Sequence, residues 1–264
     1  MADSVTVTVE GPVGRITLDE PDRLNAVDAP MLDAVTEAVV ALGADPAVRV
    51  IAVAGAGRGF CAGANLAVGS GGAPPQVGTD TLDAAGLLVR SLVDCPTPTV
   101  ALVHGVAAGV GVSIALACDY VLASEAASFV LAFARIGLMP DGGATALVAA
   151  SVGRARAMRL ALTGEKLDGA TAAAWGLVAE AVPAEDFDAR AAALLDQLGG
   201  SAPEAARETA SAINAATLDL GGALDREERG QARLLQSPDF VEGVLAFLEK
   251  RPARFGATRP GSLA

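Results

Sequence analysis

Hydrophobic and polar residues alternate at the start of the chain. Residues 4–10 (SVTVTVE) and 14–19 (GRITLD) place an apolar residue at nearly every second position, and a Gly-Pro-containing turn separates them. Alternation with a period of two is typical of a strand with one buried face, and the glycine and proline between the runs favour a tight turn. The segment therefore predicts a β-hairpin.

The pattern changes to a helical period after the hairpin. Asp28 precedes Pro30, and apolar residues then recur at helical spacing, at Leu32, Val35, Val39 and Leu42. Aspartate accepts hydrogen bonds from the free amides of a first helical turn, and proline is well tolerated in that turn. We expect a helix that begins after Asp28 and buries this apolar face.

Strands and helices then alternate up to about residue 140. Residues 48–54 and 98–103 form β-branched apolar runs, each followed by a glycine-rich loop, and a helix is predicted over about 79–93. Shorter strands are expected at 119–123 and 128–131. Residues 70–78 (SGGAPPQVG) suggest a mobile surface loop.

From about residue 142 helical segments dominate. They are expected to break at glycine and proline positions, namely Gly164, Gly176, Pro183, Gly199–Gly200, Pro203 and Gly221–Gly222. The chain is thus predicted to be an α/β protein with a helical C-terminal part. Its last sixty residues suggest a packing or assembly element.

One apolar stretch, Val100–Cys118, is long enough to span a bilayer. His104 interrupts it, Asp119 follows it directly, and no basic cluster flanks it. The run also divides into a strand, a glycine loop and a helix. We therefore expect a protein without a membrane-spanning segment.

The overall composition excludes several classes of protein. Of the 264 residues 52% are hydrophobic, so intrinsic disorder is excluded as the main state. The net charge is −12, and one Trp, one Tyr and seven Phe offer few stacking surfaces, which argues against a nucleic-acid partner. Three cysteines without CxxC spacing fit free thiols in a reducing cytoplasm.

The two glycine-rich loops are the first candidates for chemistry. They read AGAGRGFCAGANL (residues 54–66) and VHGVAAGVGVSIALACD (residues 103–119). No GK[ST] follows either one, and the spacing does not match a dinucleotide-binding fingerprint. Two alternatives remain: plain structural turns, or an oxyanion hole in which each loop directs one backbone N–H at the same oxygen.

Ordinary nucleophilic and metal sites are not indicated. His104 is the single histidine, no G-x-S-x-G elbow is present, and no carboxylate or cysteine cluster accompanies the histidine. A buried, hydrogen-bonded histidine is the simpler interpretation. Cys61 and Cys118 lie in apolar surroundings and are expected to be packing residues.

Asp141 is the remaining candidate. It lies between Pro140 and Gly142-Gly143, just before an apolar helical segment. One interpretation is a helix N-cap. The other is an acid at the mouth of an apolar pocket, where burial would raise its pKa towards the range that suits proton transfer.

Taken together and in this order, these segments resemble the crotonase superfamily, the enoyl-CoA hydratase/isomerase family. The resemblance rests on RITLDEPDRLNAVDAPML, GAGRGFCAGANL, HGVAAGVGVSIALACDYVLAS, FARIGLMPDGGATALV, ALTGEKLDGATAAAWGLVAEAVP and DFVEGVLAFLEKRPARF. It implies a spiral of ββα turns over residues 1–200 and a C-terminal helical region over 201–264 that supports trimers, often paired into hexamers. It also implies acyl-CoA thioester substrates, with coenzyme A as part of the substrate and no further cofactor.

The resemblance assigns roles by position. The amides of Ala64 and Val110 would form the oxyanion hole. Contacts to coenzyme A would come from Arg23, Leu24, Ala26, Ala62 and Leu66, and Phe247 and Lys250 would cover its adenine and 3′-phosphate end.

By motif position, the resemblance places Ser113 and Phe133 where the family's hydratases have two glutamates, and neither residue can act as a carboxylate. Asp141 resembles the aspartate of the family's isomerases. The resemblance therefore implies an isomerase that moves a double bond with one carboxyl group while Phe133 excludes water. The alternatives are a hydratase with an unusual acid–base set and a catalytically lapsed acyl-CoA-binding protein.

Overall fold

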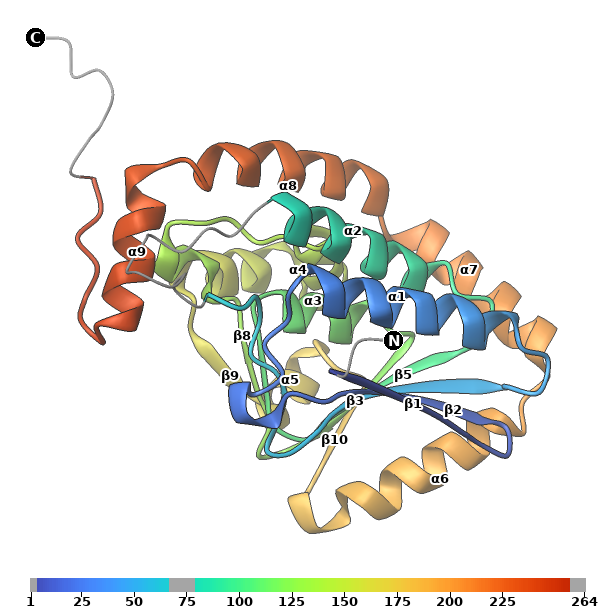
Figure 1. The fold of residues 1–264 in the computed structure, drawn as a ribbon. Helices are drawn as coiled ribbons and strands as arrows, with labels where there is room; N and C mark the ends of the chain where they lie inside the picture. Colours follow the sequence, from blue (N-terminus) through green and yellow to red (C-terminus); the bar gives the residue numbers. More distant parts are fainter. Residues whose placement is uncertain (1–3, 67–78, 257–264) are drawn as a thin grey trace, which may run out of the picture.

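The computed structural model describes residues 4–66 and 79–256. They form two sheets with helices around them (Figure 1). The strands of the larger sheet, in spatial order, are β1 (Val5–Glu10), β2 (Val13–Leu18), β3 (Val50–Gly55), β5 (Thr99–Val103), β7 (Tyr120–Ser124) and β10 (Glu180–Val182). Those of the smaller sheet are β4 (Gly59–Cys61), β6 (Val106–Ala108), β8 (Ser128–Val130) and β9 (Lys166–Asp168).

The helices follow the strands in a regular order. They are α1 (Ala29–Ala44), α2 (Thr79–Val93), α3 (Val110–Ala117), α4 (Ala144–Thr163), α5 (Gly169–Trp175), α6 (Phe187–Gly199), α7 (Pro203–Thr217), α8 (Leu220–Leu234) and α9 (Pro238–Leu248). A short 3-10 helix, η2 (Ala132–Ile136), precedes α4, and others cover Pro21–Arg23 and Ala184–Asp186.

Three consecutive ββα units build the core. The strand pairs β3–β4, β5–β6 and β7–β8 each give one parallel strand to either sheet and are followed by α2, α3 and α4. This arrangement is the predicted ββα spiral. Its consequence for the site is that the ends of β4 and β6 lie side by side, so the glycine-rich loops that follow them are neighbours.

The N-terminal predictions are confirmed. β1 and β2 pair antiparallel from Val5 opposite Leu18 to Glu10 opposite Val13. The Asp28 side chain accepts a hydrogen bond of 3.1 Å from the amide of Met31, which caps α1. Local capping and turn chemistry favour both elements, and packing of α1 against α2 and of β2 against β3 adds to their stability.

The larger sheet is covered on both faces (Figure 1). α6 packs against one face through Phe187, Ala191, Leu194 and Leu195. The other face contacts the main core, to which α1, α2 and α3 contribute. β3 and β5 are therefore buried on both sides, which explains why their sequences are continuous apolar runs rather than alternating ones.

Two expectations about the second half need correction. The predicted break at Gly221–Gly222 is wrong, because both glycines lie in the first turn of α8, where the backbone amides lack intrahelical partners in any case. The second glycine loop is shorter than expected, since residues 106–108 form β6. The expected loop at 70–78 lies outside the described residues.

Within the described ranges, no helix is long and apolar enough to cross a membrane.

Candidate active site

The two glycine-rich loops touch each other through their backbones. A Cβ atom on Gly63 would lie 2.9 Å from the carbonyl oxygen of Ala108, and Gly63 has a φ of +95°. A Cβ atom on Gly111 would lie 2.5 Å from the carbonyl oxygen of Cys61. Glycine is therefore required at both positions by close approach, and at Gly63 by conformation as well.

In these loops the backbone N–H groups of Ala64 and Val110 are available to a ligand. Val27 donates to the Gly63 carbonyl and accepts from the Asn65 amide, both at 2.8 Å, so the intervening Ala64 N–H points away from Val27. Val110 is the first residue of α3, where no preceding carbonyl can accept its N–H. Neither amide donates a hydrogen bond to another described residue.

Ala64 and Val110 both line one cavity of about 290 Å³. Its wall is largely apolar and comes from both glycine loops, α2, η2, α8 and α9. Seven of the residues expected at the site lie on it, namely Ala62, Ala64, Leu66, Val110, Phe133, Asp141 and Phe247. Among the described lining residues Asp141 carries the single carboxyl group. An apolar pocket with a few convergent polar groups is typical of a small-molecule site.

A larger hollow of about 940 Å³ lies beneath α7. It contains Cys95 and Asp119 but neither of the two amides. The Asp119 carboxylate is already bonded by the amide and hydroxyl of Thr99, at 2.8 and 2.9 Å. The chemistry therefore converges on the smaller cavity.

Asp141 is held from two sides. The Gln231 side-chain amide donates to its Oδ2 at 2.8 Å, and the Ser113 hydroxyl donates to its backbone carbonyl at 2.8 Å. Burial raises the pKa of Asp141 to about 7 and the negative charge of Glu227 adds to this, while the Gln231 hydrogen bond opposes it. A carboxyl group with such a pKa can both accept and release a proton near neutral pH.

Glu227 stabilises the loop that follows Asp141. Its carboxylate accepts hydrogen bonds from the Gly143 amide at 2.6 Å, from the Thr145 amide at 2.8 Å and from the Thr145 hydroxyl at 2.5 Å. The N-cap of α4 is Gly143, so the interpretation of Asp141 as the helix cap is wrong. A glutamate from a distant helix caps α4 instead, and burial raises its pKa.

We expect Glu227→Ala to destabilise the protein by about 2–4 kcal/mol, because it leaves the buried amide of Gly143 and the part-buried amide of Thr145 without acceptors. The free energy of unfolding in urea measures the effect. Glu228→Ala, one residue along α8 on its exposed face, is the matched control and should change stability by less than about 0.5 kcal/mol. Equal effects of the two variants would contradict this role of Glu227.

Ser113 and Phe133 are both buried near the loop that contains Asp141. Ser113 is fully buried and bonded to the Asp141 backbone. Phe133 is 6% exposed, and its ring lies against the second glycine loop, with Cζ 3.7 Å from where a Cβ on Gly109 would be. Neither residue offers a carboxylate to a water molecule in the cavity.

With this geometry established, comparison with known proteins identifies the family. The model of the enoyl-CoA hydratase/isomerase family matches residues 8–258. The chain belongs to the enoyl-CoA hydratase/isomerase family. A Rhodobacter capsulatus protein named "Probable enoyl-CoA hydratase" is 43% identical over 91% of this chain and 93% of its own length. The 1,2-epoxyphenylacetyl-CoA isomerase of Escherichia coli is 38% identical over 97% and 99%.

Solved structures agree with this family assignment. The crystal structure of an enoyl-CoA hydratase from Mycobacterium avium subsp. paratuberculosis has a TM-score of 0.91 and 46% identity, and the match covers 97% of this chain and all of that one. The ββα spiral of this chain is therefore the fold of an enoyl-CoA hydratase/isomerase, the crotonase fold.

Four residues expected at the site from the family resemblance lie away from the cavity lining. They are Arg23, Leu24, Ala26 and Lys250. Arg23 is exposed and donates to Glu20 at 2.8 Å, and Lys250 is exposed just after α9. Leu24 adopts a left-handed conformation in the turn before Asn25. Their expected contacts with coenzyme A stay predictions.

Sequence reasoning missed the two residues of α8 that hold the Asp141 loop. Glu227 and Gln231 are each 1% exposed. Their spacing carried a signal, since α8 has buried residues at Leu220 and Ala223 and the same face continues through positions 227 and 231. Polar side chains on a buried helical stripe indicate that they have hydrogen-bond partners elsewhere in the fold.

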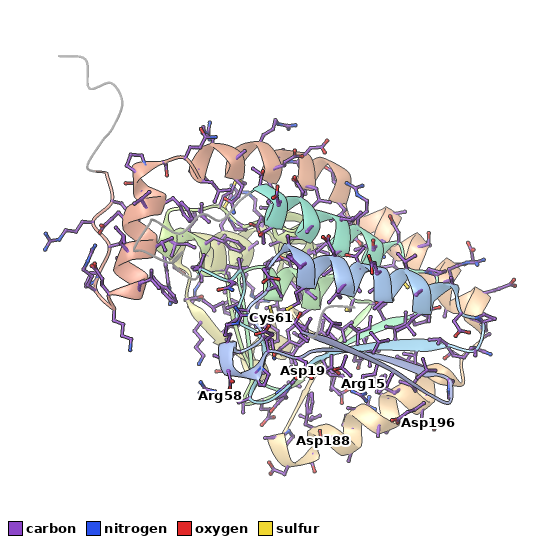
Figure 2. All side chains as sticks on the ribbon, in the orientation of Figure 1. Arg15, Asp19, Arg58, Cys61, Asp188 and Asp196 are labelled. Carbon is purple, nitrogen blue, oxygen red and sulfur yellow. The ribbon has the colours of Figure 1, made fainter. Side chains whose placement is uncertain are left out.

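The other candidate residues have structural roles. Among the described residues, no group of three His, Cys, Asp or Glu could hold a metal ion. His104 bonds the Gly57 carbonyl at 2.9 Å as expected, but it is half-buried rather than buried. Cys61 lies in the interior (Figure 2), and burial raises the pKa of its thiol to about 12; the pKa of Cys118 is also raised by burial.

The raised pKa of Asp141 makes the stability of this family member depend on pH. The ordinary pKa is 3.8 and the folded value about 7, so the folded chain binds the proton more tightly than the unfolded chain does. Its contribution to stability is complete below about pH 4 and is lost as the pH rises to about 7. Asparagine does not ionise, so the variant Asp141→Asn should not lose this stability as the pH rises.

We therefore expect Asp141→Asn to be more stable than the wild type at pH 8, by up to about 4 kcal/mol, with the difference vanishing near pH 4. Urea denaturation midpoints measured between these two pH values test this. A pH-independent difference between the two proteins would contradict the raised pKa.

Proposed function

We propose that this chain is an enoyl-CoA isomerase, in which Asp141 moves one proton along the carbon chain of an acyl thioester. The observation that carries the proposal is that Asp141 bears the single carboxyl group among the described residues of a cavity that is also lined by Ala64 and Val110, whose amides donate no hydrogen bond to another described residue. Hydrolysis and hydration need a positioned water, whereas double-bond migration needs one base and a hole for the enolate oxygen.

The reaction has two proton transfers. The Asp141 carboxylate takes a proton from the α carbon of a 3-enoyl thioester, and the electron pair moves into a dienolate. The Ala64 and Val110 amides stabilise the negative charge that develops on the thioester oxygen. The protonated Asp141 then returns the proton to the γ carbon, which yields the 2-enoyl thioester and restores the carboxylate.

The pKa of Asp141 suits both steps. At a pKa of about 7 the group is half ionised at neutral pH, and its proton affinity is higher than that of an exposed aspartate. Half ionisation and a raised proton affinity both suit a group that must act first as a base and then as an acid.

The apolar wall supports isomerisation over hydration. By the family resemblance, Phe133 and Ser113 take the places of the two glutamates of the family's hydratases, and both residues are buried. Without a second carboxyl group to activate water, addition across the double bond loses general acid–base assistance worth about 10²–10⁴-fold. The name of the Escherichia coli relative, an isomerase of a CoA thioester, is in line with this proposal.

The nucleotide end of the substrate belongs to the same proposal. Phe247 lines the cavity and is 62% exposed, so its ring is available to cover a ligand at the mouth. Lys250, three residues later, would meet a phosphate. A trimer, in which these residues could serve a neighbouring site, stays a prediction, as does a cytoplasmic location.

The second candidate is an unusual hydratase, favoured by the name of the Rhodobacter capsulatus relative. One assay set separates the alternatives. Purified protein receives a 3-enoyl-CoA and, separately, a 2-enoyl-CoA, and absorbance and product mass are followed. Conversion of the first without a gain in mass supports isomerisation. Addition of one water to the second supports hydration, and binding without turnover supports a lapsed acyl-CoA-binding protein.

A further inference from the structure

Gln231 makes three hydrogen bonds from a fully enclosed position on α8. Its Oε1 accepts from the Met139 amide at 3.2 Å, and its Nε2 donates to the Met139 carbonyl at 3.0 Å. The same Nε2 donates to Asp141 Oδ2 at 2.8 Å. Only 1% of the residue is exposed, so water does not compete for these hydrogen bonds.

Met139 fixes which way the Gln231 amide faces. A backbone N–H only donates and a backbone carbonyl only accepts, so a rotated amide would set donor against donor and acceptor against acceptor. Rotation would also turn Oε1 towards the Asp141 carboxylate, where it would be repelled. Gln231 therefore presents a permanent N–H to one oxygen of Asp141.

The two oxygens of Asp141 consequently differ. Oδ2 accepts the Gln231 hydrogen bond, and the better acceptor of a neutral carboxylic acid is its carbonyl oxygen. The proton of the neutral acid therefore resides on Oδ1. Within residues 4–66 and 79–256 no hydrogen bond engages Oδ1, and that atom is not among the buried atoms that lack a partner, so it is open to the cavity.

We propose that Gln231 is a positioning residue that divides the carboxyl group of Asp141 into an anchored oxygen, Oδ2, and a proton-carrying oxygen, Oδ1, directed at the substrate. The inference rests on the proposed function, because it assigns the atom through which the proton shuttle runs. Gln231 itself touches no reacting atom.

The surroundings add few competing charges. Glu227, from the same helix, is the neighbouring carboxylate and is already occupied by Gly143 and Thr145. Arg135 on η2 lines the cavity, and its guanidinium donates to the Gly164 carbonyl at 2.6 Å. Ser113, from α3, contributes only a hydroxyl. Gln231 is thus the neutral donor that favours the ionised form of Asp141.

The test compares Gln231→Met with Gln236→Met, the same substitution at an exposed position just beyond α8. The readout is the pH profile of kcat/KM for conversion of a 3-enoyl-CoA to its 2-enoyl isomer. The acid limb of this profile is the fall of kcat/KM at low pH, where Asp141 becomes protonated. In Gln231→Met the hydrogen bond to the Asp141 carboxylate is lost, so this limb should move upward by about one to two pH units. At neutral pH kcat should fall about tenfold or more, with KM changed less than about threefold. Gln236→Met should keep the wild-type profile.

Gln231→Glu keeps the size of the side chain and guards against a folding defect in the methionine variant. It donates to Asp141 only when protonated, so its acid limb should also lie above that of the wild type. Suppose that kcat/KM of both Gln231 variants falls at the same acidic pH as in the wild type, while Asp141→Asn is inactive. That result would overturn the role of Gln231 and leave the proposed function intact. An active Asp141→Asn would instead overturn the proposed function.

Discussion

Asp141→Asn is expected to lower kcat for double-bond migration by about 10²–10⁴-fold, with KM changed only a few-fold. Asparagine keeps the volume of the side chain, and its carbonyl oxygen can still accept from Gln231, so the loop geometry is preserved. What is lost is the group that takes and returns the proton. The measurement is steady-state kinetics with a 3-enoyl-CoA, combined with a binding titration of the same ligand.

The matched control is Asp196→Asn. Asp196 is exposed on α6, on the opposite side of the larger sheet from α8 (Figure 2), and should leave kcat unchanged. Binding that survives in Asp141→Asn while turnover disappears supports the shuttle. Turnover within a few-fold of the wild type would remove Asp141 from the mechanism.

Val110→Pro is expected to lower kcat by about 10²–10³-fold, because it removes the backbone N–H of Val110. Val110 is the first residue of α3, a position where proline is well tolerated because the N–H has no helical partner. Gly109, which precedes it, has no side chain to clash with the proline ring. The substitution therefore removes one proposed oxyanion donor and leaves the helix in place.

Val110→Ala separates the amide from the side chain. It retains the N–H and removes two methyl groups from a residue that is 4% exposed, so it should cost some stability and little catalysis. Kinetics of both variants, with circular dichroism to verify folding, decide the outcome. If proline and alanine lowered kcat equally, the amide would have no special role and the side chain would explain the loss.

The parts of the fold that sequence patterns predicted are those with local causes. The alternation in β1 and β2, the Asp28 cap of α1 and the continuous apolar runs of β3 and β5 each follow from neighbouring residues. Three-residue strands such as β6 lay below what periodicity can resolve, since one alternation is indistinguishable from a loop.

The site residues also fall into those with a local sequence signal and those without one. Glycine spacing identified two loops whose contact the structure confirms, and the Pro-Asp-Gly-Gly turn drew attention to Asp141. The interactions that hold Asp141 were not predictable from local pattern, because Gln231 lies 90 residues further along the chain and Glu227 lies 84 residues from Gly143. Only the path of α8 across α2 and α4 brings them together.

The most direct test of the shuttle is isotopic. A 3-enoyl-CoA carrying deuterium on its α carbon is converted by the enzyme in heavy-oxygen water, and the first product is analysed by mass spectrometry. The account predicts a 2-enoyl-CoA without heavy oxygen, in which part of the deuterium has moved to the γ carbon. A heavy-oxygen 3-hydroxyacyl-CoA as first product would contradict it.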